Sequence, residues 1–158
     1  MKIWFDTEFC EDGKTIELIS IGMVREDGAT YYAEVFDAVE IASKNEWLKS
    51  NVRPHLIGMN NNKKIIAKET IKFAGDKPEF WAYYADYDWV VLCQLYGRMI
   101  DLPALWPMFC MDVKQFAAME GNPRLPKQFG IEHHALADAL HTKLMWKFLM
   151  HRKVYGDD

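Results

Sequence analysis

The sequence is poor in cysteine and has no long hydrophobic run. Both absences narrow the classes of protein to which it can belong. Its 158 residues include three cysteines, Cys10, Cys93 and Cys110, without a CxxC or Cys/His spacing. Neither a disulfide framework nor a zinc cage is therefore expected. No segment approaches the roughly 18 consecutive apolar residues of a membrane span, and the opening MKIWFDTEF has no signal-peptide pattern. We expect a soluble cytoplasmic protein with reduced thiols.

Positive charge is also scarce. Lys and Arg number 19 against 23 Asp and Glu, which gives a formal net charge of -4. A protein that coats nucleic acid by bulk charge needs an excess of Lys and Arg, because these residues displace the counterions of the phosphates. A nucleic-acid enzyme is not excluded, because clustered carboxylates are themselves negative and bound metal ions offset that charge.

The apolar content indicates one folded domain. Hydrophobic residues make up 50% of the chain and aromatic residues 14%, which excludes disorder. A chain of this length buries roughly two thirds of the surface that its unfolded form exposes. Because there is no repeat, low-complexity tract or linker, we expect a single domain over residues 1–158.

The first 36 residues have the pattern of three strands. Residues 2–8, 15–25 and 30–36 are apolar, aromatic or rich in β-branched side chains. The dipeptides Asp12-Gly13 and Asp27-Gly28 separate them, and such dipeptides favour hairpin turns. The sequence therefore predicts an antiparallel three-strand meander.

The rest of the chain alternates between helical and strand patterns. Apolar spacing predicts helices over residues 40–52, 62–75, 86–96, 112–120 and 134–151, a strand over 79–85, and a frayed end over 154–158. This order is typical of an α/β fold in which a mixed sheet, combining the antiparallel meander with parallel strands, is flanked by helices.

Acidic residues stand at three separate places where a site is expected. Asp6 and Glu8 point to one face of the first strand, because side chains alternate along a strand. Asp88 follows the fourth strand at the start of a helix, and Asp138 lies in the last helix five residues after His133. Sheet proteins commonly bind ligands at such strand ends and helix N-termini.

Each of these residues also has a plain structural interpretation. Asp6 and Glu8 can simply meet water at a strand end, and Asp88 can complement a helix dipole while Asp86 caps the helix. His133 can be an ordinary hydrogen-bonded histidine. A competing metal interpretation places zinc on one helical face formed by residues 134, 138 and 141, which are His, Asp and His.

Taken together, the segments FDTEF, AYYADYDWVVL and HHALADA resemble the three motifs of the DEDDh 3′-5′ exonuclease superfamily. Asp6 and Glu8 match the first motif, Asp88 the second, and His133 with Asp138 the third. Segments 5–24, 79–97 and 121–139 further resemble the small stand-alone enzymes called polyadenylate-specific 3′-exoribonuclease AS. The second motif departs from the superfamily, because two tyrosines, residues 83 and 84, stand where many relatives have His-Asn.

The resemblance implies an RNase H-like fold and a metal-dependent mechanism. Asp6, Glu8, Asp88 and Asp138 would hold two Mg²⁺ ions, with Mn²⁺ as a substitute, and His133 would act as general base on a metal-bound water. The expected reaction is 3′-to-5′ hydrolysis of RNA ends, including 3′ overhangs of structured RNA, with release of nucleoside 5′-monophosphates. His134 is the rival general base. Relatives commonly form homodimers, so a homodimer is expected by analogy.

Five residues near the motifs are expected to contact the substrate. The backbone N–H of Thr7 is a candidate contact for the 3′-terminal nucleotide, and Trp81 and Tyr83 are candidates for stacking on bases, with a core position as their alternative. Arg124 and Lys127, in the loop before the third motif, are candidate phosphate contacts. A run of lysines at residues 63, 64, 68 and 72 fits a solvated helix face equally well.

Three other functions remain open from the sequence. The first is a 3′-5′ DNA exonuclease of the proofreading or repair type, acting on single-stranded DNA 3′ ends. The second is an inactive nucleic-acid-binding module, which predicts the loss of at least one motif acid although none is missing here. The third is a zinc hydrolase built on the last helix.

Overall fold

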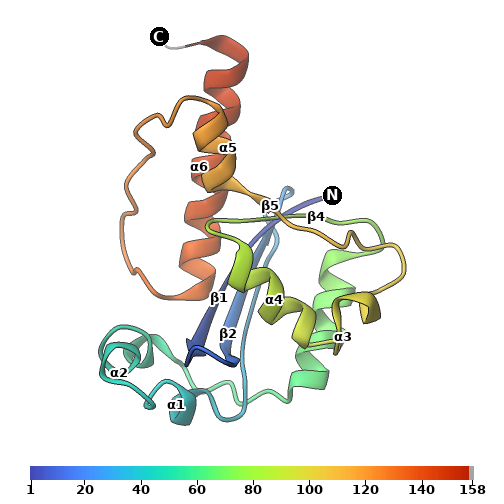
Figure 1. The fold of residues 1–158 in the computed structure, drawn as a ribbon, viewed down its shortest axis with the longest axis vertical. Helices are drawn as coiled ribbons and strands as arrows, with labels where there is room; N and C mark the ends of the chain where they lie inside the picture. The colour runs from blue at the N-terminus through green and yellow to red at the C-terminus, as the bar shows by residue number, and fades with distance from the viewer. Residues whose placement is uncertain (157–158) are drawn as a thin grey trace.

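The computed structural model describes residues 1–156, in which a five-stranded mixed sheet has helices on both faces (Figure 1). The strand order is β3-β2-β1-β4-β5. The first three strands form the predicted antiparallel meander, and the last two run parallel to the central strand. The strands are β1 (Lys2–Glu11), β2 (Ile16–Arg25), β3 (Thr30–Glu34), β4 (Glu79–Ala82) and β5 (Met111–Asp112). The α/β mixed sheet expected from the sequence is confirmed.

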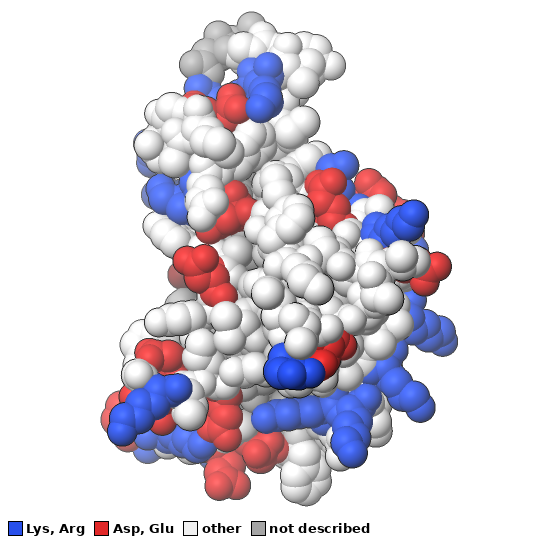
Figure 2. Space-filling view, turned by 45° about the vertical axis from the view of Figure 1, so that its right-hand side comes forward, with Lys and Arg blue, Asp and Glu red and all other residues white. Residues whose placement is uncertain are grey.

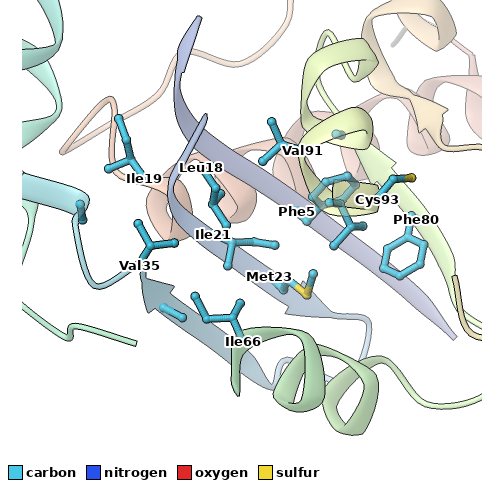
Figure 3. Close-up of a cluster of buried hydrophobic side chains, with 14 of the residues drawn as sticks. Phe5, Leu18, Ile19, Ile21, Met23, Val35, Ile66, Phe80, Val91 and Cys93 are labelled. Atoms are coloured by element: carbon cyan, nitrogen blue, oxygen red, sulfur yellow. The ribbon is translucent and has the colours of Figure 1, made fainter. Parts of the chain in front are cut away.

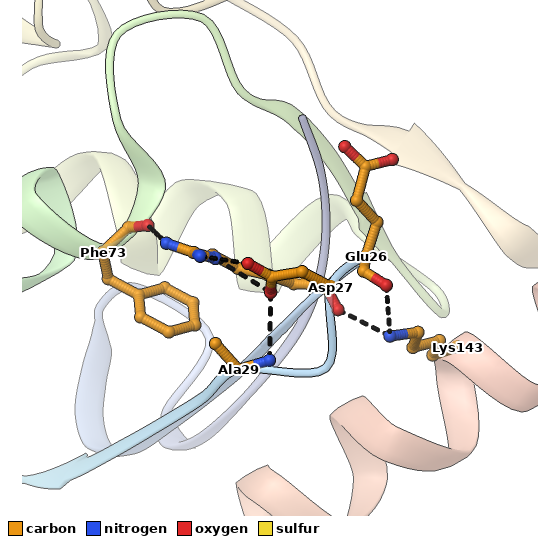
Figure 4. A network of polar contacts seen from close by, with 6 residues as sticks. Glu26, Asp27, Ala29, Phe73 and Lys143 are labelled. Atoms are coloured by element: carbon orange, nitrogen blue, oxygen red, sulfur yellow. Dashed lines mark hydrogen bonds and ion pairs between the residues drawn. The ribbon is translucent and has the colours of Figure 1, made fainter.

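Both predicted hairpin turns are present. Asp12 accepts hydrogen bonds from the backbone N–H groups of the two residues at the end of its turn, at 2.9 and 2.7 Å. In the second turn Gly28 has φ +94°, a conformation that glycine adopts without steric cost. Arg25 pairs with Asp27 there, and Lys143 donates to two backbone carbonyls of the same turn (Figure 4). The β2–β3 turn is thereby tied to the last helix.

Six α-helices and two 3₁₀ turns lie between and after these strands in residues 1–156. None of the helices in this range is long and apolar enough to cross a membrane. The helices are α1 (Ala38–Ile41), α2 (Glu46–Asn51), α3 (Lys63–Ala74), α4 (Asp86–Gln94), α5 (Val113–Met119) and α6 (Ala135–Tyr155), and the 3₁₀ turns are η1 (Arg53–His55) and η2 (Met99–Asp101).

Several boundaries differ from the sequence prediction. The helix expected over 40–52 is two short helices, because Asn45 is extended and its side chain caps Leu48 at the start of α2. The strand expected over 79–85 ends at Ala82, and Tyr84 then adopts a left-handed conformation with φ +56°. The two-residue strand β5 was not predicted. Residues 154 and 155, expected to fray, continue α6, whereas 157 and 158 lie outside the described residues.

The hydrophobic core lies on both faces of the sheet. On one face Phe5, Ile21 and Met23 pack toward Ile66 of α3 and Val91 of α4 (Figure 3). The opposite face packs against α5 and α6 through a second buried cluster: Trp4, Val24, Trp81, Val113, Phe116, Ala117, Ala139, Met145 and Leu149. Because side chains alternate along β1, the residues that follow Trp4 on its face, at positions 6 and 8, point toward α6.

Gly22 sets how closely α6 approaches the sheet. It pairs with Asp6 across the β1–β2 ladder, and a Cβ atom on it would overlap the backbone of Ala135 and Leu136 in the first turn of α6. The absent side chain therefore allows the helix N-terminus to lie directly on the sheet beside Asp6. Close backbone approach is a recognised use of glycine within strands.

Replacing Gly22 with alanine should move α6 away from β2. We expect Gly22→Ala to lower the free energy of unfolding by about 1–3 kcal/mol, the usual cost of overpacking a well-packed contact. Urea denaturation followed by tryptophan fluorescence measures the change. Thr30→Ala, at an exposed position of β3, is the control and should stay within about 0.5 kcal/mol of the parent. A Gly22→Ala protein as stable as the control would contradict this packing role.

Candidate active site

Two carboxylates project from β1 toward α6. Glu8 is 8% exposed and Asp6 is partly exposed. The β1–β2 register shifts between Glu8 and Phe9, so a bulge follows directly after the second acid. Bulges are frequent next to active sites, where they change the direction of a side chain. The strand therefore presents both acids on the face that the N-terminus of α6 covers.

Asp88 reaches the same region from the first turn of α4. It is 5% exposed, and its Oδ1 accepts hydrogen bonds from the backbone N–H of Thr7 at 2.7 Å and from the Thr7 hydroxyl at 2.6 Å. Thr7 lies between the two acids of β1 but points to the other side of the strand. These two bonds fix the Asp88 carboxylate against β1.

Asp138 is supplied by the first turn of α6 and is held at both oxygens. The backbone N–H of His133 donates to Oδ2 at 3.0 Å, and the side-chain amide of Gln128 donates to Oδ1. The same amide also donates to the carbonyl of Ile131 at 2.9 Å. The loop before α6 is therefore tied to the acid that this helix carries.

The two adjacent histidines have different roles in the structure. His134 is the N-cap of α6: its Nδ1 accepts from the backbone N–H of Ala137 at 3.4 Å, and its ring stacks on Tyr32 with centroids 4.5 Å apart. His133 adopts a left-handed conformation with φ +61°, which turns it out of the helix. Its ring forms a T-shaped pair with the ring of Trp47, with centroids 4.8 Å apart.

His133 lies beside the acids, in an open pocket of about 460 Å³. Ligand atoms of Glu8, His133 and Asp138 lie within 4.8 Å of one another. The pocket lining combines the acids with aromatic, basic and amide side chains: Asp6, Tyr83, Leu125, Pro126, Lys127, Gln128, Glu132, His133, Asp138, His141, Thr142 and Met145. The opening is large enough to admit part of a nucleotide-sized molecule.

Burial, together with repulsion from neighbouring acids, raises the pKa values of Asp6, Glu8 and Asp88. Burial and the charges of Asp88, Glu8 and Asp138 raise the pKa of Asp6 well above its ordinary value. Burial, followed by the Asp138 charge, raises the pKa of Glu8 to about 8. Burial raises the pKa of Asp88 to about 6, although the hydrogen bonds from Thr7 oppose the rise.

No lysine or arginine within residues 1–156 forms an ion pair with any of these four carboxylates. Buried charges normally require a partner of opposite sign. The arrangement of oxygen donors therefore fits a bound divalent cation, which would neutralise the repulsion.

The predicted substrate residues fall in different environments. Tyr83 and Lys127 line the pocket, and Arg124 is exposed in the loop that leads to it. Thr7 is buried, and its backbone N–H, expected to meet the substrate, already donates to Asp88. Trp81 is also buried, and its indole N–H donates to Glu79, so it belongs to the core rather than to a stacking platform.

The zinc alternative does not fit the geometry. Within residues 1–156, the ligand group close enough to hold one ion contains His133 and Asp138 but neither His134 nor His141. The Nδ1 atom of His134 already accepts the capping hydrogen bond from the backbone N–H of Ala137. The i, i+4, i+7 spacing predicts side chains on one helical face, but it does not determine whether their rotamers bring the ligand atoms together.

Two site residues were missed by the sequence analysis. Trp47 of α2 is 53% exposed beside His133, and Gln128 orients Asp138. Trp47 lies outside the three segments, 5–24, 79–97 and 121–139, that carry the resemblance. Gln128 stands in an irregular loop, where no periodicity signals a contact.

The raised pKa values have a consequence for stability. In EDTA, between pH 5 and 8, the folded protein binds more protons at Glu8 than the unfolded chain does, because the pKa of Glu8 is about 8 when folded and near 4.5 when unfolded. The free energy of unfolding should therefore fall as pH rises through this range, by at most about 1.4 kcal/mol per pH unit for one group.

Replacing Glu8 with glutamine should flatten this slope and stabilise the protein at pH 8. The exposed Glu40→Gln is the matched control and should leave the slope unchanged. Urea unfolding at several pH values measures both variants. A parent protein whose stability rises with pH over this interval would contradict the electrostatic description.

Comparison with known proteins places this chain in a family. Residues 1–150 match the family described as the 3'-5' exoribonuclease Rv2179c-like domain. Two Mycobacterium tuberculosis proteins, 3'-5' exoribonuclease MT2234.1 of strain CDC 1551 / Oshkosh and 3'-5' exoribonuclease Rv2179c of strain H37Rv, are each 39% identical over 147 residues. The matched segment covers 88% of this chain and 87% of each relative.

Solved structures share the fold at low sequence identity. The Mg²⁺ and Mn²⁺ bound form of S. pombe Pop2p has a TM-score of 0.61 and 16% identity, and the match covers 98% of this chain and 83% of Pop2p. Exonuclease I has a TM-score of 0.56 and 14% identity, with 96% of this chain and 43% of exonuclease I covered. These likenesses confirm the RNase H-like exonuclease fold expected from the motifs.

The names of the family and of both relatives confirm the sequence prediction of an enzyme of the 3′-5′ exoribonuclease class. Because the family match spans nearly the whole chain and the relatives are 39% identical over most of their length, this chain belongs to the Rv2179c-like 3'-5' exoribonuclease family.

Proposed function

We propose that this protein is a metal-dependent 3′-5′ exoribonuclease of the DEDDh type, related in specificity to the AS enzymes. Asp6, Glu8, Asp88 and Asp138 would hold two Mg²⁺ ions, for which Mn²⁺ can substitute. The observation that carries the proposal is the convergence of four carboxylates from β1, α4 and α6 without a cationic partner among residues 1–156.

The donor set supports hard divalent cations. Carboxylate oxygens are the ligands that Mg²⁺ and Mn²⁺ prefer. Pop2p, which has the same fold, is described with both ions bound, which supports the choice of metal. When bound, such ions polarise the phosphodiester and stabilise the negative charge that develops during its hydrolysis.

The protein residues have separate roles in the proposed reaction. Thr7 holds Asp88, and Gln128 together with the His133 backbone orients Asp138. The His133 imidazole, on the pocket wall, accepts a proton from the attacking water. Water oxygen bonds to the phosphorus of the last phosphodiester, and the bond to the 3′ oxygen of the preceding nucleotide breaks. That oxygen takes up a proton from solvent to become the new 3′-hydroxyl, and a nucleoside 5′-monophosphate leaves.

The pocket also carries groups suited to the terminal nucleotide. Tyr83 and Lys127 line it, and the exposed indole of Trp47 beside His133 offers a flat surface on which the terminal base can stack. The choice of RNA over single-stranded DNA rests on the names of the relatives, and 3′ overhangs are proposed from the resemblance to the AS enzymes alone. Arg124, in the exposed loop, would contact phosphate.

We also propose that the protein forms a homodimer and is cytoplasmic. A homodimer would need an apolar contact surface, and Phe129, Leu140 and Leu144 are exposed next to one another beside the N-terminal half of α6. A cytoplasmic location fits the free cysteines among the described residues.

A nuclease assay tests the function. End-labelled RNA and DNA of one sequence are incubated with the protein in Mg²⁺, Mn²⁺, Zn²⁺ or EDTA. We expect stepwise 3′ shortening of RNA in Mg²⁺ or Mn²⁺, none in EDTA, and loss of at least about 10²-fold in rate for Asp6→Asn. Equal rates on DNA would favour the DNA exonuclease, and tight binding without cleavage would favour the binding module.

A pair of histidine variants tests the assignment of the general base. We expect His133→Asn, which tolerates the left-handed backbone, to lower kcat by about 10²–10⁴-fold. His134→Ala removes a helix cap, so it should cost about 1 kcal/mol of stability while kcat changes little. Steady-state kinetics and thermal unfolding measure the two effects. The reverse pattern would make His134 the base.

A further inference from the structure

A row of lysines lies on one side of α3. Lys64, Lys68 and Lys72 follow one another at four-residue intervals, which places them on one helical face about 6 Å apart along the axis. All three are exposed, and none forms an ion pair with another residue in the described part of the chain. Figure 2 shows Lys and Arg side chains gathered at the lower right of the surface, on the side of α3.

A second pocket of about 530 Å³ lies between this helix and the edge strand β3. Tyr31, Tyr32 and Phe73 supply aromatic walls, and Arg25 and Lys72 supply positive charge; the other lining residues are Met59 and Glu69. The combination of aromatic rings and cations is typical of surfaces that bind single-stranded nucleic acid. The oxygens of Glu69 are partly engaged, because the hydroxyl of Tyr31 donates to one of them at 2.9 Å.

The wall of this pocket is held in place by the β2–β3 turn. The guanidinium of Arg25 pairs with Asp27 and donates to the carbonyl of Phe73 at 3.3 Å (Figure 4). Its charge lies over the Phe73 ring at 5.5 Å. The Arg25 guanidinium therefore already has partners within the protein. Lys72 lines the same pocket and has no ion-pair partner among residues 1–156.

The second pocket adjoins the active site through one aromatic pair. Tyr32 lines the second pocket and stacks on His134 at 4.5 Å, and the preceding residue, His133, lines the catalytic pocket. Strand β3 is the edge of the five-stranded sheet, and at its end the N–H of Asn61 donates to the carbonyl of Glu34, two residues beyond Tyr32. A polynucleotide strand that leaves the catalytic pocket can therefore continue over Tyr32 onto α3.

We propose that the RNA upstream of the 3′ end crosses β3 at Tyr32 and lies on α3, where Lys64, Lys68 and Lys72 contact its phosphates. This inference rests on the proposed function and specifies its substrate class: RNA that extends several nucleotides beyond the scissile bond, rather than dinucleotides. The negative catalytic pocket attracts metal ions, whereas the separate basic surface attracts the polyanion.

Matched triple variants test the proposal. Lys64→Glu/Lys68→Glu/Lys72→Glu reverses the row, and Lys14→Glu/Lys77→Glu/Lys147→Glu makes the same change in net charge at exposed lysines elsewhere. Both are assayed for kcat/KM on a single-stranded RNA of about 20 nucleotides and on a dinucleotide. Binding of the same labelled RNA in the Asp6→Asn background is followed by fluorescence anisotropy at several salt concentrations.

We expect the α3 triple to lose at least about tenfold in kcat/KM on the long RNA and to keep dinucleotide hydrolysis within about twofold. The plot of log affinity against log salt has a negative slope, and the magnitude of this slope should fall by about 2, because three phosphate contacts on a single strand are lost. The control triple should change little on either substrate.

Three results would overturn the proposal. Equal losses of activity in both triple variants would indicate an effect of net charge alone. Normal binding and cleavage of long RNA by the α3 triple variant would show that the RNA does not contact this surface. Loss on both substrates together with a changed oligomeric state in size-exclusion chromatography would make α3 a protein interface. Failure of the parent protein to cleave either substrate contradicts the proposed function instead, and the anisotropy measurement still tests the surface.

Discussion

The close contact between Gly22 and the first turn of α6 is the constraint on which the site depends. The acids of β1 can face the acid of α6 only if the helix lies directly on the sheet, and the backbone of Ala135 and Leu136 occupies the space that a side chain at Gly22 would fill. Because Gly22 pairs with Asp6, the contact fixes the third motif beside the first. Further along α6, Met145 and Leu149 pack in the buried cluster that includes Trp4, and this contact holds the rest of the helix against the sheet.

This geometry brings like charges together in a poorly solvated place, and the surrounding structure stabilises them only in part. Thr7 donates twice to Asp88, and Gln128 and a backbone N–H donate to Asp138, yet the pKa values of Asp6 and Glu8 remain raised. The left-handed backbone at His133, like the strand bulge after Glu8, lies at the same site. Such local strain tends to concentrate where function requires a particular geometry.

The distribution of charge explains how a protein of net charge -4 can act on a polyanion. The negative groups of the catalytic pocket lie where cations would neutralise them, and the row of lysines on α3 lies on the other side of the edge strand. The net charge of the whole sequence sums the acidic pocket and the row of lysines, so it reveals neither of them. In the proposed function, their separation in space would let one surface attract metal ions while another attracts phosphates.

Local signals were enough to predict the meander, the main helices and the candidate acids, because alternation, helical spacing and turn dipeptides act over a few residues. Asp6 and Glu8 share a face through strand geometry alone, and the motifs identified Asp88, His133 and Asp138. Tertiary structure alone decided that Thr7 faces Asp88, that Trp81 is buried and that Trp47 stands beside His133. The contact of Thr7 with Asp88 spans 81 positions and that of Trp47 with His133 spans 86, and no local pattern encodes a distance across the fold.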